Sequence, residues 1–406
     1  MKKPTFKLLV YAQQFIGECM PIYPLYALMF SERSGLNNSE IGLLFLGWVI
    51  IAMVAEVPTG IIADKFSRKS ALVYSYLLQG SAFLIWLAFP SFLGYALGFL
   101  AWGIGYAFSS GTFQAYLYEE LKAQGQTTSF SKIFARSQSL KLIGMVVAYI
   151  AASIIGAKNY AVVLVLSSLG SFIAAGITCL FPYKSKRNRA ENSAESHITM
   201  LRSAVKEVRG NKTALAYVIA LGVLMGMAGT MEEYTPLFYS NIGFSTETVP
   251  LILAAGLILS SLFGWYAHHL EHVRFATVAS FVIVAGVVFF IGTYGQFVGL
   301  FGALIFMRLT MLAQTLFGAS LQHTIQDGQR ATIGSLASFG GEVMSLGFIG
   351  IATILFTMLG NIMTYRILAI IFIGLGIILV ILGKARHLRV DAPTANDPTT
   401  VPGHPV

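Results

Sequence analysis

Long runs of apolar residues, separated by short polar segments, make up most of this chain. An α-helix needs about 20 apolar residues to cross the ~30 Å hydrocarbon core of a bilayer. Twelve runs reach that length, at residues 6–30, 41–62, 71–90, 92–118, 131–156, 159–181, 213–240, 249–268, 275–294, 297–322, 332–358 and 362–383. The pattern therefore predicts an all-α polytopic membrane protein with twelve transmembrane helices.

The composition supports that interpretation. Of the 406 residues, 56% are apolar and 11% are charged, whereas about 25% of the residues in an ordinary soluble domain are charged. A soluble enzyme is therefore excluded. Cys19 and Cys179 both lie in apolar runs, so no disulfide framework is expected. Lys2, Lys3 and Lys7 precede a run without a small-residue cleavage site, which predicts an uncleaved first span.

The formal net charge of +9 has a topological explanation. With the N-terminus on the cytoplasmic side, 22 of the 27 lysines and arginines fall on cytoplasmic segments. Three fall in outer loops (Arg33, Lys158 and Arg366) and two lie inside the membrane (Lys141 and Arg308). Because lysine and arginine concentrate in cytoplasmic loops, we expect a cytoplasmic (inner) membrane protein with both termini cytoplasmic. No nucleic acid partner is expected.

A long basic segment at residues 182–212 divides the spans six and six. It predicts a first six-helix bundle over residues 1–181 and a second over residues 213–383, joined by a cytoplasmic linker. The second part of this linker, SHITMLRSAVKEVRGN, gathers its apolar residues on one helical face, which predicts an amphipathic helix on the inner membrane surface. The Pro- and Thr-rich tail over residues 384–406 is expected to be disordered.

The two halves carry an internal repeat. Because six spans return the chain to the same side, the repeat is parallel and predicts two bundles related by an axis along the membrane normal. The matching segments are GLNNSEIG (35–42) with GFSTETVP (243–250), Tyr23-Pro24-Leu25-Tyr26 with Thr235-Pro236-Leu237-Phe238, and Gly60-x-x-Ala63-Asp64 with Gly264-x-x-Ala267-His268.

A motif stands between the second and third spans. The segment GIIADKFSRKSA, residues 60–71, resembles the signature loop of the major facilitator superfamily, and the span count, central linker and parallel repeat agree with this resemblance. It implies a loop that latches the two halves together on the cytoplasmic side against the eleventh span, with Gly60 allowing close helix approach. The alternative is that the loop only supplies positive charge. The residues of the implied latch are Gly60, Asp64, Lys65, Arg68 and Lys69.

The chain departs from the drug:proton antiporters of that superfamily. Phe99 stands where they carry an arginine four residues before G-x-G, and the fifth span lacks their Gly-Pro pair. The segments EVPTG (56–60), SGTFQAYLYEEL (110–121) and RATIGS (330–335) resemble a broad bacterial group within the superfamily. His268 takes the repeat position of Asp64, which allows either a pH-sensitive latch or an ordinary interfacial histidine.

Six charged residues fall inside predicted spans, where each costs roughly 2.5–3.5 kcal/mol if it stays unpaired in lipid. They must be paired or face water. The six are Glu18, Glu56, Lys141, Glu232, Arg308 and Glu342.

The resemblance implies that spans 1, 4, 7 and 10 line a central cavity. Glu18 would then be a substrate or proton site, because partial loss of hydration favours its protonated form; the alternative is a static pair with Lys141. Arg308 could hold a substrate carboxylate or neutralise Glu342 or Glu233.

Glu232 and Glu233 are adjacent and point about 100° apart, so at most one is expected to face the cavity, and the sequence leaves open which one. Tyr23, Trp102 and Tyr106 are candidate substrate contacts, since aromatic rings hold hydrophobic or cationic compounds.

No P-loop, GxSxG, HExxH or CxxC motif is present, so no enzymatic activity, cofactor or metal site is expected. We predict a monomeric secondary active transporter that moves a small organic molecule by alternating access, exporting an amphipathic compound in exchange for protons. Uptake or facilitated transport of an amino-acid-like or siderophore-like solute, with Arg308 on its carboxylate, is the alternative. A membrane sensor built on a transporter fold is a third reading.

Overall fold

The computed structural model of the protein describes residues 5–65, 67–156, 159–182, 205–206, 208–266, 273–325 and 330–385. These residues form helices and short connections. The first half contains α1 (Phe6–Gly17), α2 (Tyr26–Ser34), α3 (Asn38–Lys65), α4 (Arg68–Ala88), α5 (Phe92–Ser109), α6 (Thr112–Ala123), η1 (Thr127–Ser129), α7 (Phe130–Ile155) and α8 (Tyr160–Cys179). The second half contains α10 (Lys212–Asn241), α11 (Thr248–Tyr266), α12 (Phe275–Gly292), α13 (Gln296–Thr324), α14 (Arg330–Leu359) and α15 (Asn361–Ala385).

Ten helical segments in the described part of the chain are long and apolar enough to span a membrane. The predicted fourth span corresponds to one of them, although Gly111, with φ +65°, bends it between α5 and α6. The eighth predicted span is α11, an apolar helix of 19 residues. The all-α polytopic architecture is therefore confirmed, and the first span is the element that differs most from expectation.

The prediction of one continuous helix over residues 6–30 is wrong. The chain leaves the helix after Gly17 and re-enters it at Tyr26. Pro21 and Pro24 lie in the break, and each lacks the N–H that a helix interior requires. The backbone N–H of Ile22 instead donates to Ser167 Oγ of α8, at 3.0 Å. The break is thus a consequence of two prolines in one turn, supported by a hydrogen bond to a neighbouring helix.

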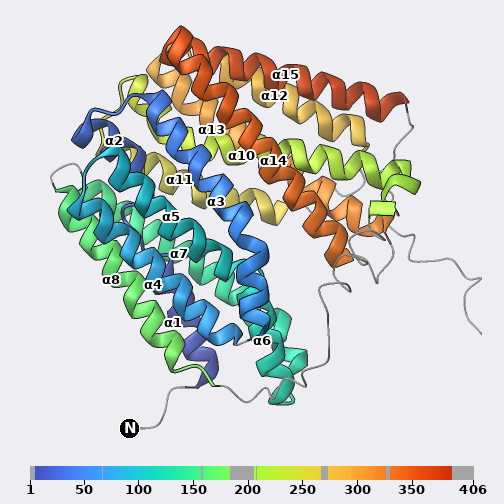
Figure 1. The fold of residues 1–406 in the computed structure, drawn as a ribbon. Helices are drawn as coiled ribbons and strands as arrows, with labels where there is room; N and C mark the ends of the chain where they lie inside the picture. Colours follow the sequence, from blue (N-terminus) through green and yellow to red (C-terminus); the bar gives the residue numbers. More distant parts are fainter. Residues whose placement is uncertain are drawn as a thin grey trace, which may run out of the picture.

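The two halves form separate bundles that meet along a central interface, as Figure 1 shows in blue to green for the first half and yellow-green to red for the second. α3 packs against α14, and α7 packs against α11, across this interface. We call the end of the bundles where α6 and α8 finish and α10 begins the linker end. The opposite end, with the turns at Gly35, Gly243 and Gly360, is the far end.

Contacts between the halves gather at the far end. The Tyr26 hydroxyl donates to Glu233, the Thr246 hydroxyl donates to Glu32, and Thr357 Oγ1 donates to Ser39 Oγ at 2.8 Å. Nearby, α3 and α14 come so close that a Cβ on Gly42 would overlap the side chain of Thr353. Hydrogen bonds and close backbone packing therefore hold the halves together at this end.

Several predictions lie largely outside the described residues. Of the expected amphipathic helix in the linker, residues 205–206 and 208–210 are described and helical, and Val208 is buried. The tail beyond residue 385 and His268 are not among the described residues. The domain boundaries and the disordered tail stay predictions.

Candidate functional site

A cavity of about 700 Å³ lies between the two halves. Its walls come from α3, α5, α6, α10 and α14, and Tyr23 from the break between α1 and α2 adds to its floor. The lining residues run from Gln114 and Gly334, near the linker end, to Tyr23 and Glu233, beside the contacts of the far end. The cavity thus reaches from the linker end to the middle of the bundles.

Four glutamates line this cavity: Glu56 from α3, Glu232 and Glu233 from α10, and Glu342 from α14. No lysine, arginine or histidine is among the described residues that line it. Glu56 and Glu342 come from opposite halves, and their charges act on each other. The cavity therefore carries four acidic groups and no compensating basic side chain on its described wall.

Both members of the Glu232 and Glu233 pair reach the cavity, so the expectation that at most one would face it is wrong. Glu232 is exposed to the open space between the helices, whereas Glu233 is half-buried and accepts the hydrogen bond from Tyr26. The cavity is wide enough to receive two side chains that point about 100° apart. Arg308 and Lys141 both act electrostatically on Glu232.

Glu18 lies at the end of α1 and pairs with Lys141 of α7, with 2.9 Å between Oε1 and Nζ. Both side chains are partly exposed, at 24% and 40% of their surfaces. Neither residue lines the cavity. The structure thus brings together the two residues that the sequence offered as a static pair, inside the first half.

Arg308 of α13 does not line the cavity, which corrects the expectation that it would face it. Its Nε and Nη1 atoms are buried and have no hydrogen-bond partner among the described residues. The guanidinium lies beside Gly256 of α11, where a Cβ would stand 3.3 Å from Nη1. The missing side chain at Gly256 leaves room for the guanidinium between α11 and α13, away from the cavity wall.

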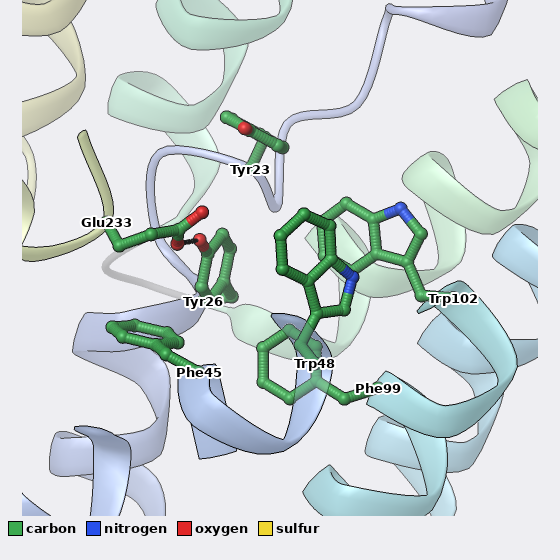
Figure 2. Close-up of a pocket in the computed structure, with 7 residues that line it drawn as sticks. All are labelled: Tyr23, Tyr26, Phe45, Trp48, Phe99, Trp102 and Glu233. Atoms are coloured by element: carbon green, nitrogen blue, oxygen red, sulfur yellow. Dashed lines mark hydrogen bonds between the residues drawn. The ribbon is translucent and has the colours of Figure 1, made fainter. Parts of the chain in front are cut away.

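The aromatic candidates lie at the floor. Tyr23 and Tyr106 line the cavity, and Trp102 lines a smaller pocket that adjoins it. Figure 2 shows this pocket, with Glu233 on one side and Trp102 and Phe99 on the other. Sequence reasoning missed Phe45 and Trp48, which line both spaces. They share a helical stripe with Glu56 in α3, and this spacing is the signal that could have found them.

Two residues of the implied latch, Arg68 and Lys69, contact other parts of the first half. Arg68 pairs with Glu119 at 3.3 Å, and Lys69 Nζ donates to the carbonyls of Cys179 at 2.8 Å and Phe181 at 2.7 Å. The expected close helix approach at Gly60 is wrong for this structure, because a Cβ there would meet open space. The side chains of Asp64 and Lys65 are outside the described residues. The latch between halves stays a prediction.

Comparison with known proteins places this geometry in a family. The family model of the Major Facilitator Superfamily matches residues 8–347. An uncharacterized MFS-type transporter, YxaM of Bacillus subtilis (strain 168), is 24% identical over 248 residues, which are 59% of each chain. The inner membrane protein YqcE of Escherichia coli (strain K12) is 21% identical over 59% of this chain and 55% of its own. The aligned part of this chain therefore spans less than two thirds of either relative's length.

Solved structures share the fold over nearly the whole chain. The crystal structure of the nucleoside transporter NupG has a TM-score of 0.75 at 18% identity and covers 95% of this chain and 99% of its own. A bacterial homologue of the lysosomal transporter Spinster has a TM-score of 0.72 at 11% identity, covering 94% and 95%. Two helical bundles around a central cavity, together with the family match, lead to one conclusion: this chain belongs to the Major Facilitator Superfamily, whose members are membrane transporters and not enzymes.

Proposed function

We propose that this protein is a secondary transporter that moves amphipathic organic cations by alternating access and exports them in exchange for protons. The observation that carries the proposal is the acidic cavity: four glutamates and no lysine, arginine or histidine among its described lining residues. A cleft of one charge sign with low-dielectric walls concentrates ions of the opposite sign. Such a cavity attracts a cation and repels an anion.

The size and chemistry of the cavity fit an organic molecule. Ligand pockets for drug-sized molecules have volumes of about 300–1,000 Å³, and this cavity has about 700 Å³. Phe45, Trp48 and Phe339 supply apolar rings beside the glutamates. An amphipathic cation can bury its apolar body against these rings while its charge meets a carboxylate.

The direction of transport follows from the topology that we propose. The linker end carries most of the lysines and arginines, so the positive-inside rule assigns it to the cytoplasm. The cavity would then be open to the cytoplasm and closed on the outer side by the contacts of the far end. A transporter in this state is ready to collect a cytoplasmic solute.

Proton coupling follows from charge balance. When a cation leaves a carboxylate that is partly removed from water, a proton can replace it and avoid a bare buried charge. The exchange would return protons inward as the cation moves outward. Uptake of a carboxylate-bearing solute is less well supported, because Arg308 does not line the cavity.

Purified protein in liposomes tests the proposal. We expect an imposed pH gradient to drive flux of labelled tyramine, an aromatic amine that is cationic at neutral pH, and an uncoupler to abolish this flux. Replacing Glu232 or Glu233 by Gln should slow the flux at least tenfold, while Glu40→Gln, at the far end of α3, serves as the matched control. The proposal would be contradicted by a tyramine flux that is independent of the pH gradient and unchanged in both glutamine variants. Preferred transport of an organic anion would also contradict it.

A further inference from the structure

The small pocket at the floor of the cavity has the composition of a cation site. Six aromatic side chains and one carboxylate line it: Tyr23, Tyr26, Phe45, Trp48, Phe99, Trp102 and Glu233. It shares Tyr23, Phe45, Trp48 and Glu233 with the large cavity, so the two spaces adjoin. We call this pocket the aromatic box.

The rings of the aromatic box form a connected network. The centroid of Trp102 is 5.9 Å from that of Tyr23, 5.9 Å from that of Tyr26 and 6.0 Å from that of Phe99. A cation within about 6 Å of an aromatic centroid is attracted by the negative face of the ring, most strongly for tryptophan and in sites removed from water. A charged group inside the box would therefore meet several rings at once.

Glu233 supplies the negative charge of the box. Tyr26 donates one hydrogen bond to its Oε2 atom, and a carboxylate offers about four acceptor sites, so capacity is left for further donors. Glu232, its neighbour, feels the positive charges of Arg308 and Lys141. Among the described residues, no salt bridge joins Glu233 to a lysine or arginine, and its side chain is half-buried. Glu233 is therefore the carboxylate of the box that can accept N–H hydrogen bonds from a bound cation.

The size of the box selects among cations. The space inside it that is open to the centre of a water molecule is about 20 Å³, and one water needs at least about 10–15 Å³ by the same measure. The box thus admits a group of roughly the size of one water. An –NH₃⁺ group meets this limit, whereas a trimethylammonium group does not.

From these observations we infer that the aromatic box is a headgroup site for primary ammonium, in which Glu233 accepts N–H hydrogen bonds and the rings of Tyr23, Tyr26 and Trp102 face the charge. The inference rests on the proposed function and narrows its substrate class to amphipathic primary amines. Quaternary ammonium compounds of the same body should be poor ligands.

A matched series of three probes tests the inference by calorimetric binding to the full-length protein in detergent. The probes are tyramine, its N,N,N-trimethyl derivative and the neutral alcohol 4-(2-hydroxyethyl)phenol, which differ only in the headgroup. We expect tyramine to bind at least tenfold more tightly than either of the other two. Glu233→Gln should weaken tyramine binding at least tenfold, and Glu232→Gln should weaken it less, while Glu40→Gln is the control.

Enlarging the box gives a readout that misfolding cannot imitate. Trp102→Ala removes one wall, so the affinity for the trimethyl derivative should rise at least threefold while the preference for tyramine falls. Phe99→Leu is a milder variant with the same expected direction. Gained binding in either variant requires a folded site.

The possible failures are separable. Equal affinity of the wild-type protein for tyramine and its trimethyl derivative, or unchanged tyramine binding in Glu233→Gln, would overturn the headgroup site and leave an acidic cation cavity standing. Binding of the neutral alcohol as tightly as both cations would overturn the inference and the proposed function together.

Discussion

The first helix of each half begins from the same repeat, yet the two helices have different shapes. In the first half, α1 and α2 are separated by a break over residues 18–25. In the second half, α10 runs unbroken from Lys212 to Asn241, although Pro236 lies inside it at the repeat position of Pro24. One proline is tolerated in a membrane helix, whereas two prolines in one turn accompany a break.

The difference decides what each half contributes to the site. In the alignment that pairs Pro24 with Pro236, Glu233 stands at the position of Pro21. The first half thus has a proline and a broken backbone that turns Tyr23 and Tyr26 toward the interface, and the second half has a continuous helix that carries carboxylates. The repeat gives the two halves related helices. The positions at which the two helices differ provide the tyrosines and the carboxylates of the site. Four variants test this comparison.

The largest effect is expected from the double change Pro21→Ala and Pro24→Ala. A proline inside a helix costs about 3 kcal/mol relative to alanine, so removing both favours a continuous helix by about 6 kcal/mol. The change should move Tyr23 and Tyr26 out of the aromatic box and reduce tyramine flux in liposomes more than tenfold. Flux within twofold of the wild type would show that the break is not required.

Tyr26→Phe removes the hydrogen bond that joins the break to α10 across the interface. A hydrogen bond to a charged group contributes about 1.5–3 kcal/mol, so opening of the far end should become at least tenfold more frequent. The labelling rate of Thr353→Cys, a buried position facing Gly42, measures that opening. Tyr365→Phe, whose hydroxyl bonds within the second half, is the control; equal labelling in both backgrounds would contradict the prediction.

Lys141→Ala leaves the carboxylate of Glu18 without its cation at the start of the break. We expect a loss of about 1.5 kcal/mol in unfolding free energy, between the ~0–1 kcal/mol of exposed pairs and the ~2.5–3.5 kcal/mol of a charge in lipid. Thermal unfolding in detergent measures it. The double variant with Glu18→Ala should recover most of the loss, and a strictly additive result would argue against coupling between the two side chains.

The smallest effect is expected from Pro236→Ala. The helix is already continuous there, and the new N–H can donate to the carbonyl of Glu232. We expect a gain of about 1 kcal/mol, seen as a melting temperature a few degrees higher, with tyramine flux within about twofold of the wild type. A loss of flux comparable to that of the first-half double change would mean that both prolines act alike.

Hydropathy predicted the membrane architecture and the two halves, because the length and apolarity of a span are properties of its own residues. It did not predict the break, because a hydropathy average does not record how a proline affects the backbone. Pro21 and Pro24 lie in a break, whereas Pro236 lies inside a continuous helix. The free backbone N–H groups of a broken turn need hydrogen-bond acceptors from residues that are near in space but distant in sequence, as Ser167 is for Ile22.

The candidate site was predictable to the extent that burying a charge is costly. That cost singled out Glu56, Glu232 and Glu342, which the structure places around the cavity. The partner of each charge depends on elements far apart in the chain, so the orientation of Arg308 toward Gly256 could not be derived from sequence. The helical spacing of Phe45 and Trp48 with Glu56 is visible in the sequence, but that this side of α3 faces α10 and α14 is known only from the structure.

The packing of Trp102 against Trp48 and Trp86 also has a spectroscopic consequence. Three of the four tryptophans of the chain pack together, with the centroids of Trp48 and Trp86 at 6.4 Å and 5.7 Å from that of Trp102, which lines the small pocket beside the cavity. Their ultraviolet emission therefore reports mainly on one place in the molecule. Changes in its intensity or wavelength provide an intrinsic signal by which occupancy of this region can be followed in real time, without an attached dye.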